Sequence, residues 1–142
     1  PGRSRSPPRR SARVLSTCVI VPAAGSGTRL GHPEPKAFVS VDGRTLLAHS
    51  LEAIISSGVA TTIVVAAPEE FLLLARAEID EVRGRLDADD AADSAADVEI
   101  VAVVGGADRV ESVDAGLRAA GEHDVVLVHD AARALTEALV RG

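Results

Sequence analysis

Four short apolar runs divide the chain, and their positions predict the strands of a sheet. The runs span Thr17–Val21, Thr61–Ala66, Val98–Val104 and Val125–Val128, and all are rich in β-branched residues. Apolar residues follow one another in each run without alternating with polar ones. This pattern is typical of strands buried on both faces of a parallel sheet.

Between the runs, apolar residues recur with the spacing of a helix. Residues Leu46–Ile55 place their leucines and isoleucines on one helical face, with Thr45 as the expected N-cap. Pro68 and two following glutamates are expected to open a second helix, and Val113–Ala120 predicts a third. This alternation of strands and helices predicts an α/β domain with a doubly wound, mostly parallel, Rossmann-like sheet.

Length and charge divide the chain into a tail and one domain. The 142 residues suit one ordinary domain, here residues 14–142. Residues 1–13 carry five arginines and no acid, which leaves 10 basic against 21 acidic residues in the remainder. Such a tail is able to touch nucleic acid or an anionic surface, but the lack of apolar residues before Ala12 favours a disordered basic extension.

Composition excludes several classes of partner. Only two aromatic residues, Phe38 and Phe71, are present, so the stacking platforms that bind single-stranded nucleic acid are not expected. No run approaches the roughly 20 apolar residues that cross a bilayer, so no membrane association and a cytoplasmic location are expected. Cys18 lies in an apolar run and is expected to be a buried, inert thiol. The acidic segment Asp87–Asp97 is expected to be a solvated loop rather than a metal site.

Candidate chemistry follows three of the four strands. Pro22–Leu30 (PAAGSGTRL) follows the first, Gly105–Ser112 (GGADRVES) the third and His129–Arg133 (HDAAR) the fourth. Ligands of open parallel sheets bind beyond the carboxyl ends of the strands. The three loops are therefore expected to meet at one functional edge of the sheet.

The glycine-rich loop has the chemistry of an anion site. Gly25 and Gly27 allow the backbone N–H groups to surround an anion, and Arg29 and Lys36 add positive charge. Leu30 stands where the dinucleotide-binding fingerprint requires glycine, and the P-loop pattern also fails. A tight turn that needs glycine for its geometry alone is the alternative. Two cations beside such a loop suit a reaction that releases pyrophosphate.

The three loops together resemble a known family. PAAGSGTRL followed by Pro35-Lys36 resembles the start of sugar-nucleotide and alditol-phosphate nucleotidyltransferases, which have the nucleotide-diphospho-sugar transferase fold. With Gly105–Val113 and Val128–Arg133 added, the chain is similar to the 2-C-methyl-D-erythritol 4-phosphate cytidylyltransferases of non-mevalonate isoprenoid biosynthesis. The resemblance implies transfer of CMP from CTP to the alditol phosphate, release of pyrophosphate, and a requirement for Mg²⁺.

The resemblance also implies roles for individual residues. Arg29 and Lys36 would be catalytic, and Asp130 would serve the metal and the substrate, with Arg133 near the alditol phosphate. The residues expected to bind CTP are Pro22, Ala23, Ala24, Gly25, Ser26, Gly27, Thr28, Gly106, Ala107 and Ser112. From the residues themselves, His129 is expected to pack or hydrogen-bond rather than act as a base. Arg109, in the first turns of a helix, is expected to pair with Glu111 or to cap the neighbouring loop.

Departures from the family pattern leave alternatives open. Ala107 stands where the family commonly has aspartate, and family members, which form homodimers, continue beyond the equivalent of Gly142. The sheet is therefore expected to be incomplete at the C-terminus, with an uncovered apolar edge at the fourth strand. Ribitol 5-phosphate cytidylyltransferases share the three motifs and provide one alternative; an inactive CTP-binding fragment provides another. A hexose 1-phosphate nucleotidyltransferase is disfavoured by the HDAAR loop.

Overall fold

A four-stranded parallel sheet forms the centre of the fold. The computed structural model describes residues 15–24, 36–87, 98–106 and 108–131, so the expected basic extension lies outside it. The strands are β1 (Thr17–Pro22), β4 (Thr62–Ala67), β5 (Glu99–Val104) and β6 (Val125–Val128), in the order β5-β4-β1-β6. Every neighbouring pair is parallel. The predicted α/β class and all four strands are confirmed, with boundaries shifted by a residue or less.

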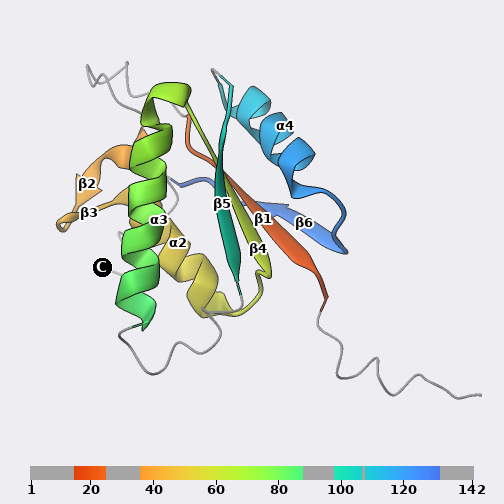
Figure 1. The fold of residues 1–142 in the computed structure, drawn as a ribbon, viewed down its shortest axis with the longest axis horizontal. Helices are drawn as coiled ribbons and strands as arrows, with labels where there is room; N and C mark the ends of the chain where they lie inside the picture. Colours follow the sequence, from red (N-terminus) through yellow and green to blue (C-terminus); the bar gives the residue numbers. More distant parts are fainter. Residues whose placement is uncertain (1–14, 25–35, 88–97, 107, 132–142) are drawn as a thin grey trace, which may run out of the picture.

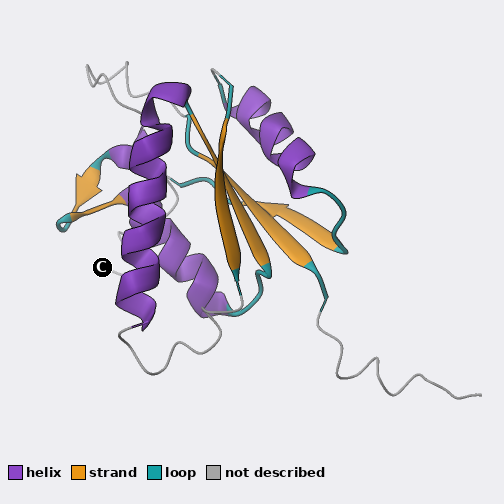
Figure 2. Cartoon of the chain, viewed as in Figure 1, coloured by secondary structure: helices purple, strands orange, loops and turns teal. Residues whose placement is uncertain are grey.

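Helices cover both faces of this sheet (Figure 1). Helices α2 (Leu46–Ser57) and α3 (Leu72–Asp87) lie on one face, and α4 (Arg109–Ala120) lies on the other, as Figure 2 also shows. A short 3₁₀ turn, η3 (Glu69–Phe71), precedes α3 after Pro68. The three-layer arrangement is the one that a doubly wound sheet requires.

The ends of the helices follow from local hydrogen bonding. The Thr45 hydroxyl accepts a hydrogen bond from the Ala48 N–H at 3.1 Å, as expected of an N-cap. Gly58, with φ of 74°, ends α2 in the left-handed conformation. Helix α4 begins at Arg109 rather than at the predicted Val113. The reason is that the Asp108 carboxylate caps the Glu111 N–H at 2.8 Å and so starts the helix one turn earlier.

The core consists of two apolar layers, one on each face of the sheet. On the α2 and α3 side, Val19 and Val21 of β1 and Ile63 and Val65 of β4 pack against the helices. On the α4 side, a smaller cluster is built on Cys18, Ile20 and Val64. Alternate residues of β1 and β4 thus point to opposite faces, and both strands are almost completely buried, as predicted.

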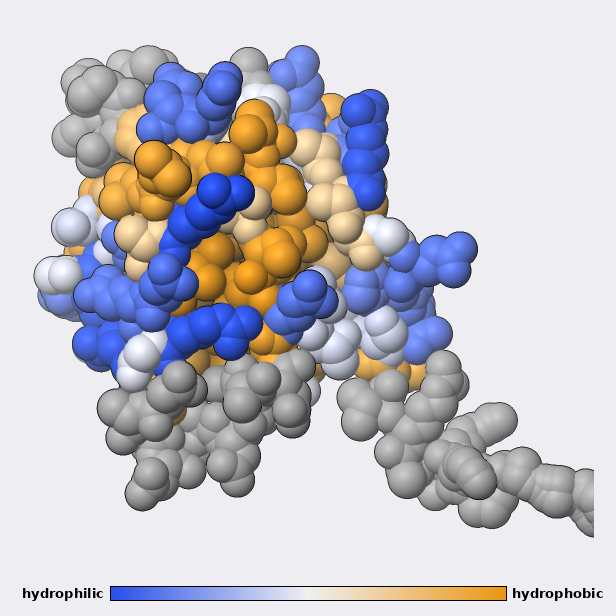
Figure 3. Space-filling model, viewed as in Figure 1, coloured by the Kyte–Doolittle hydropathy of each residue, from blue (hydrophilic) through white to orange (hydrophobic). Residues whose placement is uncertain are grey.

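The prediction that all four strands are buried on both faces is wrong for the two outer ones. In β6, Val126, Leu127 and Val128 remain between 39% and 45% exposed. Strand β5 is only partly buried, and Figure 3 shows apolar surface gathered on the face where it lies between α3 and α4. Within the described residues, each forms an outer edge of the sheet and has a neighbouring strand on one side only. The uncovered apolar edge expected at the fourth strand is confirmed.

A small hairpin that was not predicted precedes α2. Strands β2 (Ser40–Val41) and β3 (Arg44–Thr45) pair antiparallel around Asp42 and Gly43. Both turn residues have positive φ, 56° and 82°, as in the two-residue turns that suit hairpins. The Asp42-Gly43 dipeptide is a sequence signal for a hairpin turn, but strands of two residues are too short to show an alternation of apolar and polar residues.

Candidate functional site

The sheet has a topological switch point between β1 and β6. From β1 the chain moves outward through β4 to β5, and then returns through α4 to place β6 on the other side of β1. In doubly wound sheets, the crevice at such a point, beyond the carboxyl ends of the strands, is where ligands bind. The loops that begin at Ala23 and His129 flank this point.

Hydrogen bonds between the strands continue into the loops that follow them. The Ala23 N–H donates to the Ala66 carbonyl at 2.8 Å, and the Gly105 N–H donates to the Ala67 carbonyl at 2.7 Å. Beyond β6, the His129 N–H donates to the Ile20 carbonyl at 2.9 Å. The three loops therefore leave one edge of the sheet from fixed starting points, as strand-end reasoning predicted.

The loop after β5 packs tightly on the first turns of α4. A Cβ added at Gly105 would lie 2.7 Å from the Ser112 Oγ and 3.2 Å from atoms of Ala66. At Gly106, the side chain of Glu111 fills the space that a Cβ would take. These glycines are thus required for close packing. Within the described part of the chain, the fully buried Ser112 hydroxyl has no hydrogen-bond partner.

Lys36 is held near the same edge by aromatic packing. It is exposed and begins a 3₁₀ turn, η2 (Lys36–Phe38), whose Ala37 and Phe38 are buried. The ring of Phe38 stacks on that of Phe71, with centroids 5.1 Å apart and planes inclined by 21°. Phe71 lies in η3, just beyond the carboxyl end of β4. The sequence singled out these two residues as its only aromatics, but nothing in it indicated that they meet. Lys36 is also the sole lysine of the chain.

The loop after β6 is held from both faces of the sheet. Its Ala131 carbonyl accepts a hydrogen bond from the buried Ser50 hydroxyl of α2 at 2.8 Å. Its Asp130 carboxylate accepts one from the Arg109 guanidinium of α4, with Nε 2.9 Å from Oδ1. Only local partners were considered for Arg109 from the sequence. Its contact with Asp130 instead joins the loop after β6 to the helix that follows β5.

Several predicted site residues lie outside the described residues, and their roles stay predictions. These are Gly25, Ser26, Gly27, Thr28, Arg29, Ala107 and Arg133. Of the remainder, Pro22 ends β1, and Ala23 and Ala24 are buried directly after it. The structure thus describes only the first residues of the glycine-rich loop, which are buried and held by the hydrogen bond from Ala23 to Ala66.

A second charged cluster supports the hairpin. The Glu52 carboxylate of α2 accepts hydrogen bonds from Arg44 of β3 at 2.9 Å and from Arg85 of α3 at 3.1 Å. Partial burial acts to raise the pKa of Glu52, but the two guanidinium groups outweigh it and hold that pKa below its ordinary value. Three separate elements are joined here, so the role of the cluster is structural.

The remaining candidates carry no separate chemistry. Burial raises the pKa of the Cys18 thiol, as expected of an inert cysteine. The His49 ring lies 2.8 Å from the Val41 carbonyl, as part of the hairpin packing. No group of three metal-ligating side chains is found in the described residues. Across the same residues, no helix is long and apolar enough to span a membrane.

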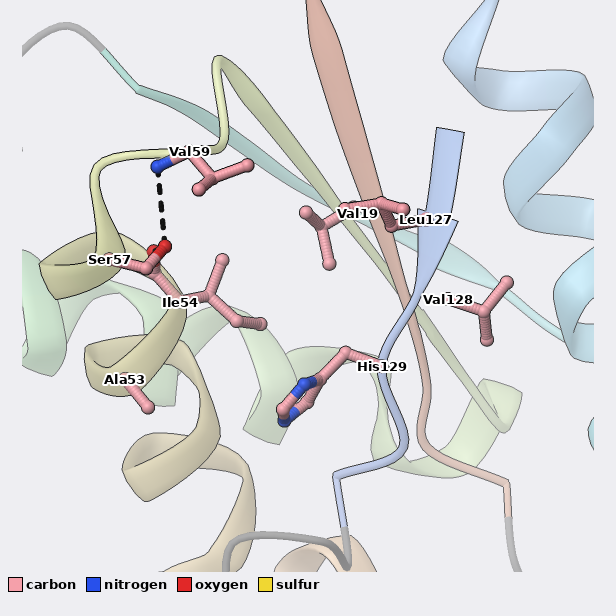
Figure 4. Close-up of a pocket in the computed structure, with 8 residues that line it drawn as sticks. All are labelled: Val19, Ala53, Ile54, Ser57, Val59, Leu127, Val128 and His129. Atoms are coloured by element: carbon pink, nitrogen blue, oxygen red, sulfur yellow. Dashed lines mark hydrogen bonds between the residues drawn. The ribbon is translucent and has the colours of Figure 1, made fainter. Parts of the chain in front are cut away.

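A cavity of about 440 Å³ lies on the α2 side of β6, shown in Figure 4. Its lining is mainly apolar and comes from β1, α2 and β6 and the segments that follow α2 and β6: Val19, Ala53, Ile54, Ser57, Val59, Leu127, Val128 and His129. No residue predicted to bind CTP or the alditol phosphate is among them. The cavity therefore does not mark the predicted nucleotide site.

Comparison with known proteins identifies the family of the chain. The family model for 2-C-methyl-D-erythritol 4-phosphate cytidylyltransferase matches residues 17–140. The chain belongs to this family. A cytidylyltransferase of that name from Rhodococcus jostii is 42% identical over 117 residues, which are 82% of this chain and 44% of the relative.

Solved structures extend the comparison to the fold. A 4-diphosphocytidyl-2C-methyl-D-erythritol synthase structure matches with a TM-score of 0.52 and 28% identity, over 89% of this chain and 52% of the other. The synthase from Anaerococcus prevotii, at 23% identity, a TM-score of 0.54 and coverage of 82% and 43%, supports the fold alone. The chain thus spans a little under half the length of the curated family member from Rhodococcus jostii.

Proposed function

We propose that this chain provides the nucleotide-binding part of a cytidylyltransferase that transfers CMP from CTP to 2-C-methyl-D-erythritol 4-phosphate. The observation that carries the proposal is the switch point between β1 and β6, together with the family match and the described starts of the three predicted loops at one edge of the sheet. The proposal includes the homodimer of the full-length family and a cytoplasmic location, where CTP is available.

The chemistry requires positive charge more than proton transfer. A phosphate oxygen of the alditol phosphate forms a bond to the α-phosphorus of CTP, and the bond from that phosphorus to the bridging oxygen breaks. Pyrophosphate leaves with the electron pair. The attacking phosphate is already ionised near neutral pH, so no general base is needed. Lys36 and Arg29 would stabilise the charge that develops on the leaving group.

The base would be recognised at the loop after β5. Gly106, Ala107 and Ser112 are the proposed cytosine contacts. Ser112 supports this assignment because its hydroxyl is buried directly beneath Gly105 and finds no partner among the described residues. A buried hydroxyl without a partner is costly, and a polar group on a bound base would satisfy it.

The donor set around Asp130 fits a Mg²⁺ ion carried mainly by the nucleotide. Magnesium sites of this kind use one or two carboxylates together with substrate phosphates. Asp130 offers one such carboxylate, and the described residues contain no larger cluster of ligands. When bound, the ion would neutralise charge on the triphosphate; Asp130 would hold it from the β6 side.

The single lysine allows a direct test of the phosphate site. Reductive methylation with ¹³C-formaldehyde would label Lys36 and the amino terminus, and the second signal serves as an internal control. Addition of CTP with Mg²⁺ is expected to shift the Lys36 signal, and pyrophosphate alone is expected to shift it in the same direction. Calorimetry should show CTP affinity falling by about 10-fold or more in Lys36→Ala and in Arg29→Ala, since each removes a phosphate contact.

Two further measurements separate the alternatives. CTP binding that is indifferent to both substitutions would contradict the phosphate-site assignment. Product analysis with CTP and either 2-C-methyl-D-erythritol 4-phosphate or ribitol 5-phosphate would identify the acceptor. Preferential turnover of ribitol 5-phosphate would contradict the proposed substrate.

A further inference from the structure

The contact between Arg109 and Asp130 joins the start of α4 to the loop after β6. Arg109 begins α4, after the outermost strand β5, whereas Asp130 follows β6 at the opposite edge. Nε of Arg109 lies 2.9 Å from Oδ1 of Asp130, and the two residues are 21 positions apart in sequence. The side chain of Asp130 is 39% exposed, so a ligand at the switch point can reach it.

Helix formation does not account for an arginine at this position. The N-terminus of a helix carries partial positive charge, and a cation there is unfavourable. Asp108 already caps α4 by accepting from the Glu111 N–H. By contrast, Arg118, near the end of the same helix, is favourably placed and pairs with Asp114 one turn before it. The position of Arg109 is therefore explained by its tertiary contact.

The contact has two consequences for Asp130. It fixes one carboxylate oxygen and leaves Oδ2 as the oxygen outside this bond. It also places a guanidinium beside the carboxylate, which weakens the attraction of Asp130 for a divalent cation that arrives without nucleotide. The Ser50 hydroxyl holds the adjacent Ala131 carbonyl from the other face, so the loop is fixed on both sides.

We propose that Arg109 is a positioning residue for the nucleotide site: its ion pair fixes Asp130 at the switch point and masks its negative charge. The inference rests on the proposed function for its ligand, CTP, but the ion pair and its effect on the loop are testable without any nucleotide. Loss of the guanidinium loosens the loop after β6 and exposes a free carboxylate. A free carboxylate attracts a divalent cation even when no nucleotide is present, whereas the loosened loop no longer holds Asp130 in one orientation toward the cation of Mg²⁺–CTP.

The test compares Arg109→Gln with Arg118→Gln, which removes the other ion pair of the same helix. Amide hydrogen exchange at His129, whose N–H is bonded to Ile20, is expected to rise by about 10-fold in Arg109→Gln and to stay unchanged in Arg118→Gln. Mn²⁺ without nucleotide is expected to broaden the Asp130 amide signal more strongly in Arg109→Gln than in the unaltered chain. The additional substitution Asp130→Asn should abolish that gain.

Nucleotide binding provides the third readout. CTP affinity is expected to fall by about 5-fold in Arg109→Gln and to recover in part in Arg109→Lys, which restores the charge without the guanidinium geometry. Equal exchange and equal Mn²⁺ broadening in Arg109→Gln and Arg118→Gln would overturn the inference, whatever the affinity for CTP. Failure of the unaltered chain to bind CTP would contradict the proposed function instead, and the exchange and Mn²⁺ measurements would still decide the role of Arg109.

Discussion

Gly116 marks the closest approach of α4 to the sheet, and its replacement by alanine tests the packing of that layer. A Cβ at this position would lie 2.6 Å from Cγ2 of Ile20 and 3.3 Å from its Cγ1. Ile20 is fully buried in β1, and a β-branched side chain in a strand has little rotamer freedom with which to move aside. The helix must therefore shift away from the sheet.

Two opposing terms determine the size of the effect. Overpacking of a well-packed core costs about 1–3 kcal/mol. Replacing glycine by alanine in a helix gains about 1 kcal/mol from helix propensity. Gly84 in α3 provides a matched control, because it is exposed and nothing lies within 4 Å of an added Cβ. Gly84→Ala should show only the gain in free energy of unfolding from helix propensity. The difference in free energy of unfolding between the two variants is therefore the cost of overpacking at Gly116.

The assay is urea unfolding at 25 °C, followed by circular dichroism, on both variants and the unaltered chain. Gly84→Ala should raise the free energy of unfolding by about 0.5–1 kcal/mol, and Gly116→Ala should lie about 1–3 kcal/mol below it. In an Ile20→Leu background, which lacks the Cγ2 methyl, the cost of Gly116→Ala should shrink. Equal stabilisation by the two alanine variants would refute the close contact between α4 and β1.

Three further predictions concern the caps and the titrating groups. Thr45→Ala should lower the free energy of unfolding by about 1–2 kcal/mol in the same urea assay, because it removes the N-cap of α2 and a hydrogen bond to Glu78, whereas Thr45→Ser should lose little. The pKa of Glu52 in the folded chain is held below its ordinary value near 4.5, which applies to the unfolded chain. At a pH between the folded and the unfolded pKa, the unfolded chain therefore binds more protons than the folded chain. The free energy of unfolding should therefore fall as the pH drops through that range, and the fall should be smaller in Glu52→Gln. The same pH dependence in Glu52→Gln as in the unaltered chain would contradict the pairing with Arg44. Cys18 should resist a thiol reagent at pH 8 in the folded chain and react once urea unfolds it, whereas rapid reaction before unfolding would contradict its burial.

Local patterns in the sequence were sufficient to predict the main helices and strands, and they singled out one edge of the sheet for the candidate site. Apolar runs predicted the four strands because a parallel strand needs little beyond β-branched apolar residues. Thr45 was recognised as a cap because the signal is confined to a few neighbouring residues. The start of α4 was missed because Asp108, its N-cap, is one of several polar residues in that segment, and no apolar periodicity marks the start of the helix there.

The order of the strands and the contacts between distant residues were decided only by the tertiary structure. A continuous apolar run looks the same in a central strand and in an edge strand. The exposure of β6 depends on its position in the sheet, where β1 is its one neighbour among the described strands. The stacking of Phe38 on Phe71 and the pairing of Arg109 with Asp130 join residues that share no periodicity. Sequence spacing reports which face of an element a residue occupies, but partners on other elements are set by how those elements cross and how closely they pack.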